Sequence, residues 1–253
     1  MILVIAGTKD GRDLITLLTE AGYKVMGSVF SDYGRDLIQI TNVPIHTGPL
    51  DSDGLVNLIA NQKITMVVDG SHPYAVNVSQ NAMEACHRTN IPYLRYERLT
   101  TPMPVYEGLH IVHDYQQAAE TASSLGNVVF LTTGSRHLPL FKSAPCLQKH
   151  RLIARILPEP NVLLECLQLG FLPQDIVALQ GPFSEQLNMA LFSEYQSEVI
   201  ITKNSGQVGG SDTKISAAIA LGLPVVVIDR PRISYDKIFY TIDDIIQFIK
   251  EAH

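Results

Sequence analysis

The sequence predicts an α/β fold of two halves, each with a parallel sheet, that face each other across a cleft. Short apolar runs rich in β-branched residues alternate with helical patterns along the chain, which is typical of βαβ units. Residues 98–108 contain two prolines and a glycine, Pro102, Pro104 and Gly108, and interrupt this alternation as a linker or crossover. Five apolar runs end in small polar clusters, and in parallel sheets such strand ends share one ligand-binding edge.

The first half, residues 1–98, is expected to begin with a strand at 2–6 and a helix over about 11–21. Leu14, Leu17 and Leu18 have the i, i+3, i+4 spacing of a buried helix face. The same rhythm predicts strands at 24–27, 66–69 and 91–95 and helices at 51–61 and 76–89.

The second half, residues 99–253, repeats this rhythm without an obvious sequence repeat. Strands are expected at 110–112, 128–132, 152–157, 176–179, 199–202 and 224–228, and helices at 115–124, 161–169, 184–195 and 211–221. A last helix at 242–252 could pack on either half.

Composition excludes several classes of protein. The chain has 253 residues, of which 46% are hydrophobic and 17% charged, as in globular domains. Its net charge of −6 and its lack of a basic cluster argue against nucleic-acid binding. No apolar stretch reaches the roughly 18 residues of a membrane span, so we expect a cytoplasmic protein. Cys86, Cys146 and Cys166 are far apart and outside any metal-binding spacing, which favours reduced thiols and no metal site.

The first strand leads through a short turn into a helix, and this turn is the candidate cofactor site. Backbone N–H groups at a helix start can bind phosphate, and Gly7, Thr8 and Arg12 stand in this turn. The turn is not a full G-x-G-x-x-G fingerprint, so an ordinary βα connection is an equal alternative.

The segment after the second strand would meet the ribose in a dinucleotide-binding fold. An acid there favours NADH and an arginine suits the 2′-phosphate of NADPH. Asp32 and Arg35 are both present, so the choice stays open, and Ser28 and Ser31 are further candidate contacts.

The third cluster combines Asp69, His72 and Tyr74 at the end of a strand. Asp69 is a candidate cofactor contact, while His72 and Tyr74 are candidates for proton transfer near neutral pH. The alternative is that Asp69 caps the next helix and His72 only forms a hydrogen bond in its turn.

Three clusters in the second half, at residues 132–136, 180–185 and 203–214, are suited to bind carboxylates. They offer hydroxyl, amide and cationic hydrogen-bond donors. Ser184 has a competing explanation as a helix cap, and the glycine-rich loop after residue 203 lacks the G-K-[ST] of a Walker A motif. The candidate substrate contacts are Thr133, Gly134, Ser135, Arg136, Gln180, Gly181, Ser184, Ser205, Gly206 and Lys214, with Lys203 as a candidate catalytic residue.

Taken together and in this order, these segments resemble the precorrin-6A reductase family of cobalamin biosynthesis over most of the chain. The markers are Gly7-Thr8 with Arg12, Ser28-Val29, Tyr33-Gly34, His46, Gly48, Leu50-Asp51, Asp69, His72-Pro73-Tyr74-Ala75, Arg95, Thr133-Gly134-Ser135, Arg155, Leu157-Pro158, Gln180-Gly181-Pro182-Phe183-Ser184-Glu185, Lys203, Ser205-Gly206 and Arg230-Pro231. Two positions depart from the family pattern: Ala6 stands where glycine is common, and Asn204 where aspartate is common.

The resemblance implies two Rossmann-like halves, the first binding NADPH or NADH and the second binding the substrate. It implies hydride transfer to a polycarboxylate, tetrapyrrole-derived macrocycle. Two motifs, Ser-Val-x-x-x-Tyr-Gly at residues 28–34 and Ser-Gly-x-x-Gly-Gly at residues 205–210, resemble the cobalt-dependent branch of the family more closely. Rival interpretations are an S-adenosylmethionine-dependent methyltransferase, a nucleotide-sugar enzyme, or a non-catalytic dinucleotide sensor.

Overall fold

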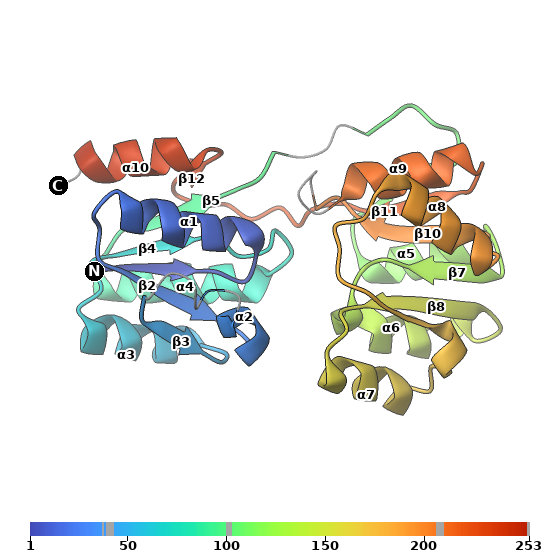
Figure 1. The fold of residues 1–253 in the computed structure, drawn as a ribbon, viewed down its shortest axis with the longest axis horizontal. Helices are drawn as coiled ribbons and strands as arrows, with labels where there is room; N and C mark the ends of the chain where they lie inside the picture. Colours follow the sequence, from blue (N-terminus) through green and yellow to red (C-terminus); the bar gives the residue numbers. More distant parts are fainter. Residues whose placement is uncertain (37, 39–42, 100–102, 206–209, 252–253) are drawn as a thin grey trace. The chain divides into compact units, whose positions relative to one another are not determined.

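The chain forms two compact units, which we describe separately (Figure 1). The computed structural model describes residues 1–36, 38, 43–99, 103–205 and 210–251. Unit 1 comprises Met1–Leu99 and Pro231–His253, and unit 2 comprises Thr100–Arg230. The first boundary lies one residue from the expected one. The second half was expected to span residues 99–253, with the place of the last helix left open; in the structure the chain already returns to unit 1 at Pro231.

Unit 1 is built around a six-stranded parallel sheet with the order β12-β5-β4-β1-β2-β3. Its strands are β1 (Ile2–Ile5), β2 (Val25–Val29), β3 (Ile45–Thr47), β4 (Met66–Asp69), β5 (Tyr93–Tyr96) and β12 (Ile238–Phe239). Its helices are α1 (Lys9–Glu20), α2 (Asp32–Asp36), α3 (Ser52–Gln62), α4 (Val76–Thr89) and α10 (Ile242–Glu251).

Helices cover both faces of this sheet, which explains why β1 and β4 are buried along their whole length. On one face, Leu14 and Leu18 of α1 share a core with Ile245 and Ile249 of α10. On the other face, α3 and α4 supply a second core that includes Leu55. The last helix, whose packing the sequence left open, therefore packs on unit 1 (Figure 1).

Unit 2 has a second six-stranded parallel sheet, with the order β6-β11-β10-β7-β8-β9. Its strands are β6 (Leu109–Val112), β7 (Val128–Leu131), β8 (Arg151–Ile156), β9 (Ile176–Ala178), β10 (Val199–Lys203) and β11 (Val225–Ile228). Its helices are α5 (Tyr115–Ser123), α6 (Leu138–Ser143), α7 (Pro160–Gln168), α8 (Glu185–Glu194) and α9 (Ser211–Ala220), with short 3-10 turns at Ser135–His137, Pro145–Leu147 and Pro173–Asp175.

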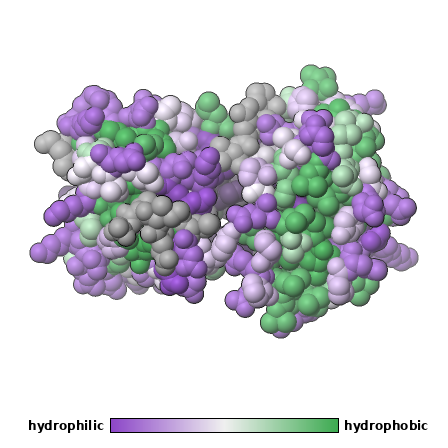
Figure 2. Space-filling model, in the orientation of Figure 1, coloured by the Kyte–Doolittle hydropathy of each residue, from purple (hydrophilic) through white to green (hydrophobic). Residues whose placement is uncertain are grey.

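The surface of unit 2 carries a broad apolar area (Figure 2). Exposed leucines of this unit include Leu163, Leu164 and Leu167 on α7. Two more, Leu157 and Leu179, directly follow β8 and β9. The carboxyl edge of this sheet therefore offers apolar as well as polar contacts.

The strand order reverses once in each sheet. In unit 1, β2 and β3 extend from one side of β1 and β4, β5 and β12 from the other, so the reversal lies between β1 and β4. In unit 2, β8 and β9 lie on one side of β7 and β10 and β11 on the other. Ligands of open α/β sheets bind outside the carboxyl ends of the strands at such a point. Each unit therefore has its own candidate binding edge.

The prediction of an α/β fold with two parallel sheets is confirmed. The cleft between the two halves stays a prediction. Cys86 and Cys166 are buried thiols, whereas Cys146 is partly exposed. Within the described ranges, no helix combines the length and the apolar character needed to cross a bilayer.

Candidate functional site

The turn after β1 is fixed by the side chain of Thr8. Its hydroxyl accepts a hydrogen bond from the Gly11 amide (3.2 Å) and so caps α1. The same hydroxyl donates to the carbonyl of Gly70 (2.9 Å), which follows β4. Thr8 thus joins the two turns on either side of the strand-order reversal. Gly11 lets α1 approach β1, because a Cβ there would lie 2.5 Å from the Cα of Ala6.

The space above this turn suits a phosphate group. Gly7 is exposed, and a Cβ built on it would meet no atom within 4 Å. Among the described residues, the guanidinium of Arg12 has no hydrogen-bond or ion-pair partner. Asp10 in the first turn of α1 would repel an anion, but it forms a buried ion pair with Arg98. The start of α1 therefore keeps the positive polarity that attracts phosphate.

The segment after β2 is held by internal contacts. Ser28 is buried, and its carbonyl accepts from the Ala6 amide (2.8 Å). The hydroxyl of Ser31 accepts from the Gly34 amide (3.2 Å). Arg35 is ion-paired with Asp32 (2.7 Å) and more weakly with Asp36 (3.5 Å). Asp32, which would favour NADH, and Arg35, which would favour NADPH, thus form an ion pair with each other.

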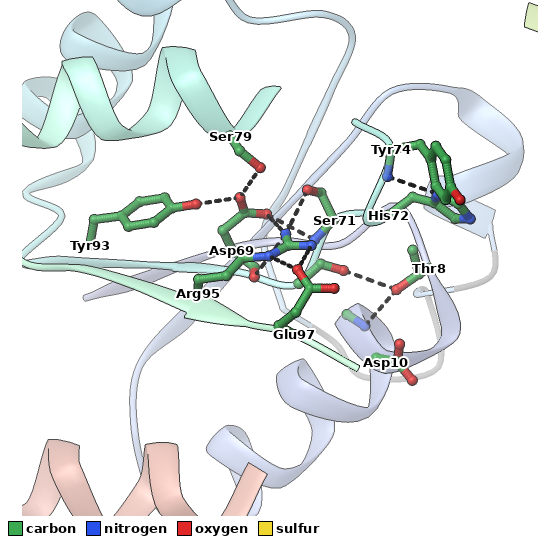
Figure 3. Close-up of polar contacts among 12 residues, drawn as sticks. Thr8, Asp10, Asp69, Ser71, His72, Tyr74, Ser79, Tyr93, Arg95 and Glu97 are labelled. Carbon is green, nitrogen blue, oxygen red and sulfur yellow. Dashed lines mark hydrogen bonds and ion pairs between the residues drawn. The ribbon is translucent and has the colours of Figure 1, made fainter. Parts of the chain in front are cut away.

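Asp69 lies at the centre of a buried network (Figure 3). One carboxylate oxygen accepts from the Ser71 amide (2.9 Å) and pairs with Arg95 (3.0 Å). The other accepts from the hydroxyls of Ser79 and Tyr93, both at 2.6 Å. Burial alone would raise the pKa of Asp69, but Arg95 and these hydrogen bonds hold it below its usual value.

This network corrects two expectations for Asp69. Its side chain is fully buried, so it is not placed to contact a cofactor. It does not cap α4 either, because the N-cap of that helix is Ala75, without a side-chain hydrogen bond. Asp69 instead fastens the turn that carries His72 and Tyr74.

His72 and Tyr74 are both partly buried just beyond the Thr8–Gly70 contact. The Nδ1 atom of His72 accepts from the Tyr74 amide (3.2 Å), as the simpler alternative had proposed (Figure 3). A neutral imidazole that accepts at Nδ1 carries its proton on Nε2. The two rings lie 5.6 Å apart. A neutral His72 thus has its hydrogen-bond donor at Nε2.

In unit 2, the turn after β7 begins beside β10 at the strand-order reversal, since the Thr132 amide donates to the Ile201 carbonyl (2.9 Å). Thr133 is buried, and its hydroxyl has no partner among the described residues. Gly134 has a φ of +80°, which favours glycine. Ser135 begins the short 3-10 turn that leads to Arg136 and His137.

Cations gather at this edge. Burial, together with a smaller effect of the nearby Arg136, lowers the pKa of Lys203 to about 8. Burial, Lys203 and Arg136 lower the pKa of His137 to about 4, so this imidazole is neutral at pH 7 and stacks on Tyr115 (3.6 Å between ring centroids). Groups of like charge that depress one another's pKa values form a site that an anionic ligand would stabilise.

The remaining substrate candidates lie on neighbouring loops of unit 2. Gln180 and Gly181 are exposed after β9, and Ser184 caps α8 by accepting from the Leu187 amide (3.2 Å). Ser205 is buried, and its hydroxyl lies 3.1 Å from that of Ser211, so it fastens its own loop. Gly206 lies outside the described residues.

Lys214 on α9 belongs to the same cationic group. Burial lowers its pKa to about 7, helped by Arg155 and Lys203 and opposed by Asp212. Within the described part of the chain, no three His, Cys, Asp or Glu side chains lie close enough to hold a metal ion.

Two residues at these edges escaped the sequence reasoning as site residues. Phe30 directly follows β2 and is 75% exposed, which is unusual for phenylalanine. Arg155 is buried inside β8, with 6% exposure. The available signals were an aromatic residue after a strand and a charge within the apolar run 152–157.

Comparison with known proteins decides the family. The family model described as "Precorrin-6x reductase CbiJ/CobK" matches residues 1–250. The chain belongs to this precorrin-6A reductase family. A cobalt-precorrin-6A reductase from Priestia megaterium is 38% identical over 97% of this chain and 96% of its own length. One from Salmonella typhimurium is 34% identical over 91% of this chain and 87% of its own.

A solved structure of this reductase family supports the same assignment. The structure of "CobK precorrin-6A reductase" is 27% identical, has a TM-score of 0.80, and is covered over 96% of its length by 99% of this chain. The resemblance inferred from the sequence motifs is therefore confirmed. The family model and the solved reductase structure both match the chain across unit 1 and unit 2.

Proposed function

We propose that the chain uses a reduced nicotinamide dinucleotide to reduce one ring double bond of a precorrin-6A-type macrocycle. It is an oxidoreductase of cobalamin biosynthesis. The observation that carries the proposal is the pair of sheet edges. The edge of unit 1 has a phosphate-compatible turn, and the edge of unit 2 gathers cations suited to a polycarboxylate.

Residues of unit 1 would hold the cofactor. The open turn at Gly7, the start of α1 and the guanidinium of Arg12 suit its phosphates. Bound there, the nicotinamide would supply the hydride. Replacing Arg12 by alanine should raise the KM for the cofactor about tenfold, as expected for one lost charge-assisted contact, and leave the KM for the macrocycle unchanged.

For the cofactor we favour NADPH over NADH. Asp32 is ion-paired with Arg35, so it is not free to accept the ribose hydroxyls that an acid at this position binds in NAD enzymes. A 2′-phosphate would instead displace the exposed Asp32 carboxylate and take its place as the partner of Arg35. Arg35→Gln should reduce the preference for NADPH, whereas Asp32→Asn should preserve it. An unchanged ratio of kcat/KM values in the arginine variant would remove Arg35 from the site.

The cobalt-containing form is the substrate that we favour. The relatives named cobalt-precorrin-6A reductase are 31–38% identical, and four of the first five exceed 34%. Those named precorrin-6A reductase are 32% and 28% identical. Lys203, Arg136 and the unpartnered Thr133 hydroxyl would receive carboxylates of the macrocycle.

Reduction of the double bond also consumes a proton. A neutral His72 carries its proton on Nε2 and is too weak an acid to give that proton up, so we infer that it uses this N–H to order a water that relays the proton from solvent, with Tyr74 as the second candidate for the donor. Both His72→Ala and Tyr74→Phe retaining wild-type turnover would exclude this role.

The deciding experiment measures NADPH oxidation under anaerobic conditions with cobalt-precorrin-6A, with the metal-free macrocycle, and without substrate. We expect macrocycle-dependent oxidation, faster with the cobalt form. A parallel binding measurement compares NADPH, NADH and S-adenosylmethionine. Binding of S-adenosylmethionine alone would move the assignment to methyl transfer.

A further inference from the structure

The described residues include three buried arginines, and only two of them have carboxylate partners. Arg95 pairs with Asp69 (3.0 Å) and Glu97 (2.9 Å), and Arg98 pairs with Asp10. Arg155 is 6% exposed and has no carboxylate within ion-pair distance among the described residues. A buried guanidinium without a counter-charge is costly, so its retention calls for an explanation.

The contacts of Arg155 orient its guanidinium without neutralising it. One terminal nitrogen donates to the side-chain oxygen of Asn188 (2.7 Å), a fully buried residue of α8. The side-chain NH2 group of Asn188 in turn donates to the Ser184 carbonyl (2.9 Å). The guanidinium lies over the ring of Phe183, 4.7 Å from its centroid. Asn188 and Phe183 thus hold the guanidinium of Arg155 in place, and its other N–H groups remain available as hydrogen-bond donors.

Other groups around Arg155 extend this environment. The hydroxyl of Thr213 on α9 donates to the Phe183 carbonyl (3.0 Å), which ties the loop after β9 to that helix. The next residue is Lys214, and after burial the charge of Arg155 is the main cause of its lowered pKa. The acid close to Lys214 is Asp212, which forms no ion pair with Arg155. The position thus carries excess positive charge.

Apolar surface borders the same place. Leu157 follows β8 directly and is 42% exposed, and Leu179 follows β9 and is 41% exposed. The Leu179 amide donates to the carbonyl of Ile156, so both leucines stand at one edge of the sheet. A ligand suited to this edge has a carboxylate attached to a large apolar body.

We propose that Arg155 anchors a carboxylate subsite on unit 2, with Asn188 as its positioning residue, and that this subsite holds one side-chain carboxylate of the tetrapyrrole-derived substrate. Only the identity of the ligand rests on the proposed function. The carboxylate would supply the counter-charge that Asp69 and Asp10 supply to the other two buried arginines. Arg155 supplies this contact from β8, whereas Arg136 lies after β7 and Lys203 is the last residue of β10.

The test uses full-length protein and uroporphyrin, a stable porphyrin with eight carboxylates, as the probe. Arg155→Met should raise its Kd at least tenfold and leave the Kd of NADPH unchanged, while Arg155→Lys should be intermediate. Lys149→Met is the charge-matched control, because Lys149 is exposed before the amino end of β8, and it should bind as the wild type.

A second variant separates binding from folding. Asn188→Asp places a carboxylate where an oxygen already lies 2.7 Å from Arg155, which would occupy the arginine internally. We expect a well-folded protein with a porphyrin Kd raised at least tenfold. Wild-type porphyrin affinity in both Arg155→Met and Asn188→Asp would overturn the proposal, as would a lack of porphyrin binding by the wild type.

The outcomes for the subsite and for the reductase are distinguishable. Arg155-dependent porphyrin binding without any NADPH-dependent reduction would keep the subsite and remove the proposed function. Macrocycle reduction with an unchanged KM in Arg155→Met would keep the function and remove the subsite.

Discussion

Replacing Asp69 by asparagine tests whether this carboxylate is the structural anchor of the unit 1 site. The substitution keeps the shape of the side chain but removes the charge that pairs with Arg95 at 3.0 Å. It also turns one carboxylate oxygen into an NH2 group, which cannot accept hydrogen bonds. The hydroxyls of Ser79 and Tyr93, which both donate to Asp69 at 2.6 Å, would therefore lose part of their acceptor. Removing one partner of a buried ion pair costs about 3–5 kcal/mol. We therefore expect unit 1 to lose about that much free energy of unfolding.

The pH dependence of this loss has a defined sign. The pKa of Asp69 is lower in the folded than in the unfolded protein, so its contribution to stability is present above about pH 4. It disappears as the pH falls through the lowered pKa. Asparagine does not titrate, so the difference between the wild type and Asp69→Asn should narrow in acid.

Hydrogen exchange read by mass spectrometry suits this measurement, because two units can unfold separately and it reports each of them. Protection should fall in β4 and β5 of the variant and stay unchanged in unit 2. Tyr93→Phe is the matched control, which removes one hydrogen bond of 2.6 Å to the carboxylate and should cost about 2 kcal/mol. A loss below about 1 kcal/mol in Asp69→Asn would refute the anchor role and return Asp69 to the list of candidate ligand contacts.

Three further substitutions test the sites. Gly11→Ala should destabilise unit 1 by roughly 1–3 kcal/mol in urea denaturation, since its Cβ would overlap Ala6. Thr8→Val removes the cap of α1 and should cost about 1 kcal/mol, with weaker NADPH binding by calorimetry. Lys214→Met should be more stable than the wild type at pH 7, because burial and then the charge of Arg155 disfavour the charged form of Lys214 and lower its pKa. This advantage should fade as the pH rises toward 10, and an advantage that stays constant with pH would contradict the reasoning.

The sequence predicted the regular elements well where a strong pattern met a clear boundary. The strand at 66–69 and the helix at 76–89 have the predicted bounds, since apolar β-branched residues and a long helical period mark them. The short strands β3 and β12 were missed. β12 has two residues and exists because Ile238 and Phe239 pair with β5, a partner more than a hundred residues earlier in the chain.

The candidate site was predicted at the level of strand ends but not of individual side chains. Asp69 was placed at the correct edge, yet its burial depends on Arg95 and Tyr93 of the neighbouring strand. Arg155 was noted only as a family marker, because its missing counter-charge is visible only in three dimensions. Charged residues inside otherwise apolar strands were the signal for both networks.

The return of the chain to unit 1 has a consequence for biosynthesis. Unit 2 is inserted in the sequence of unit 1, and β12 and α10 leave the ribosome only after all of unit 2 has been made. Until then, β5 lacks its outer neighbour and the face of β1 lacks Ile245 and Ile249. Although folding during synthesis usually starts with the N-terminal domain, here the unit that begins the chain is finished last.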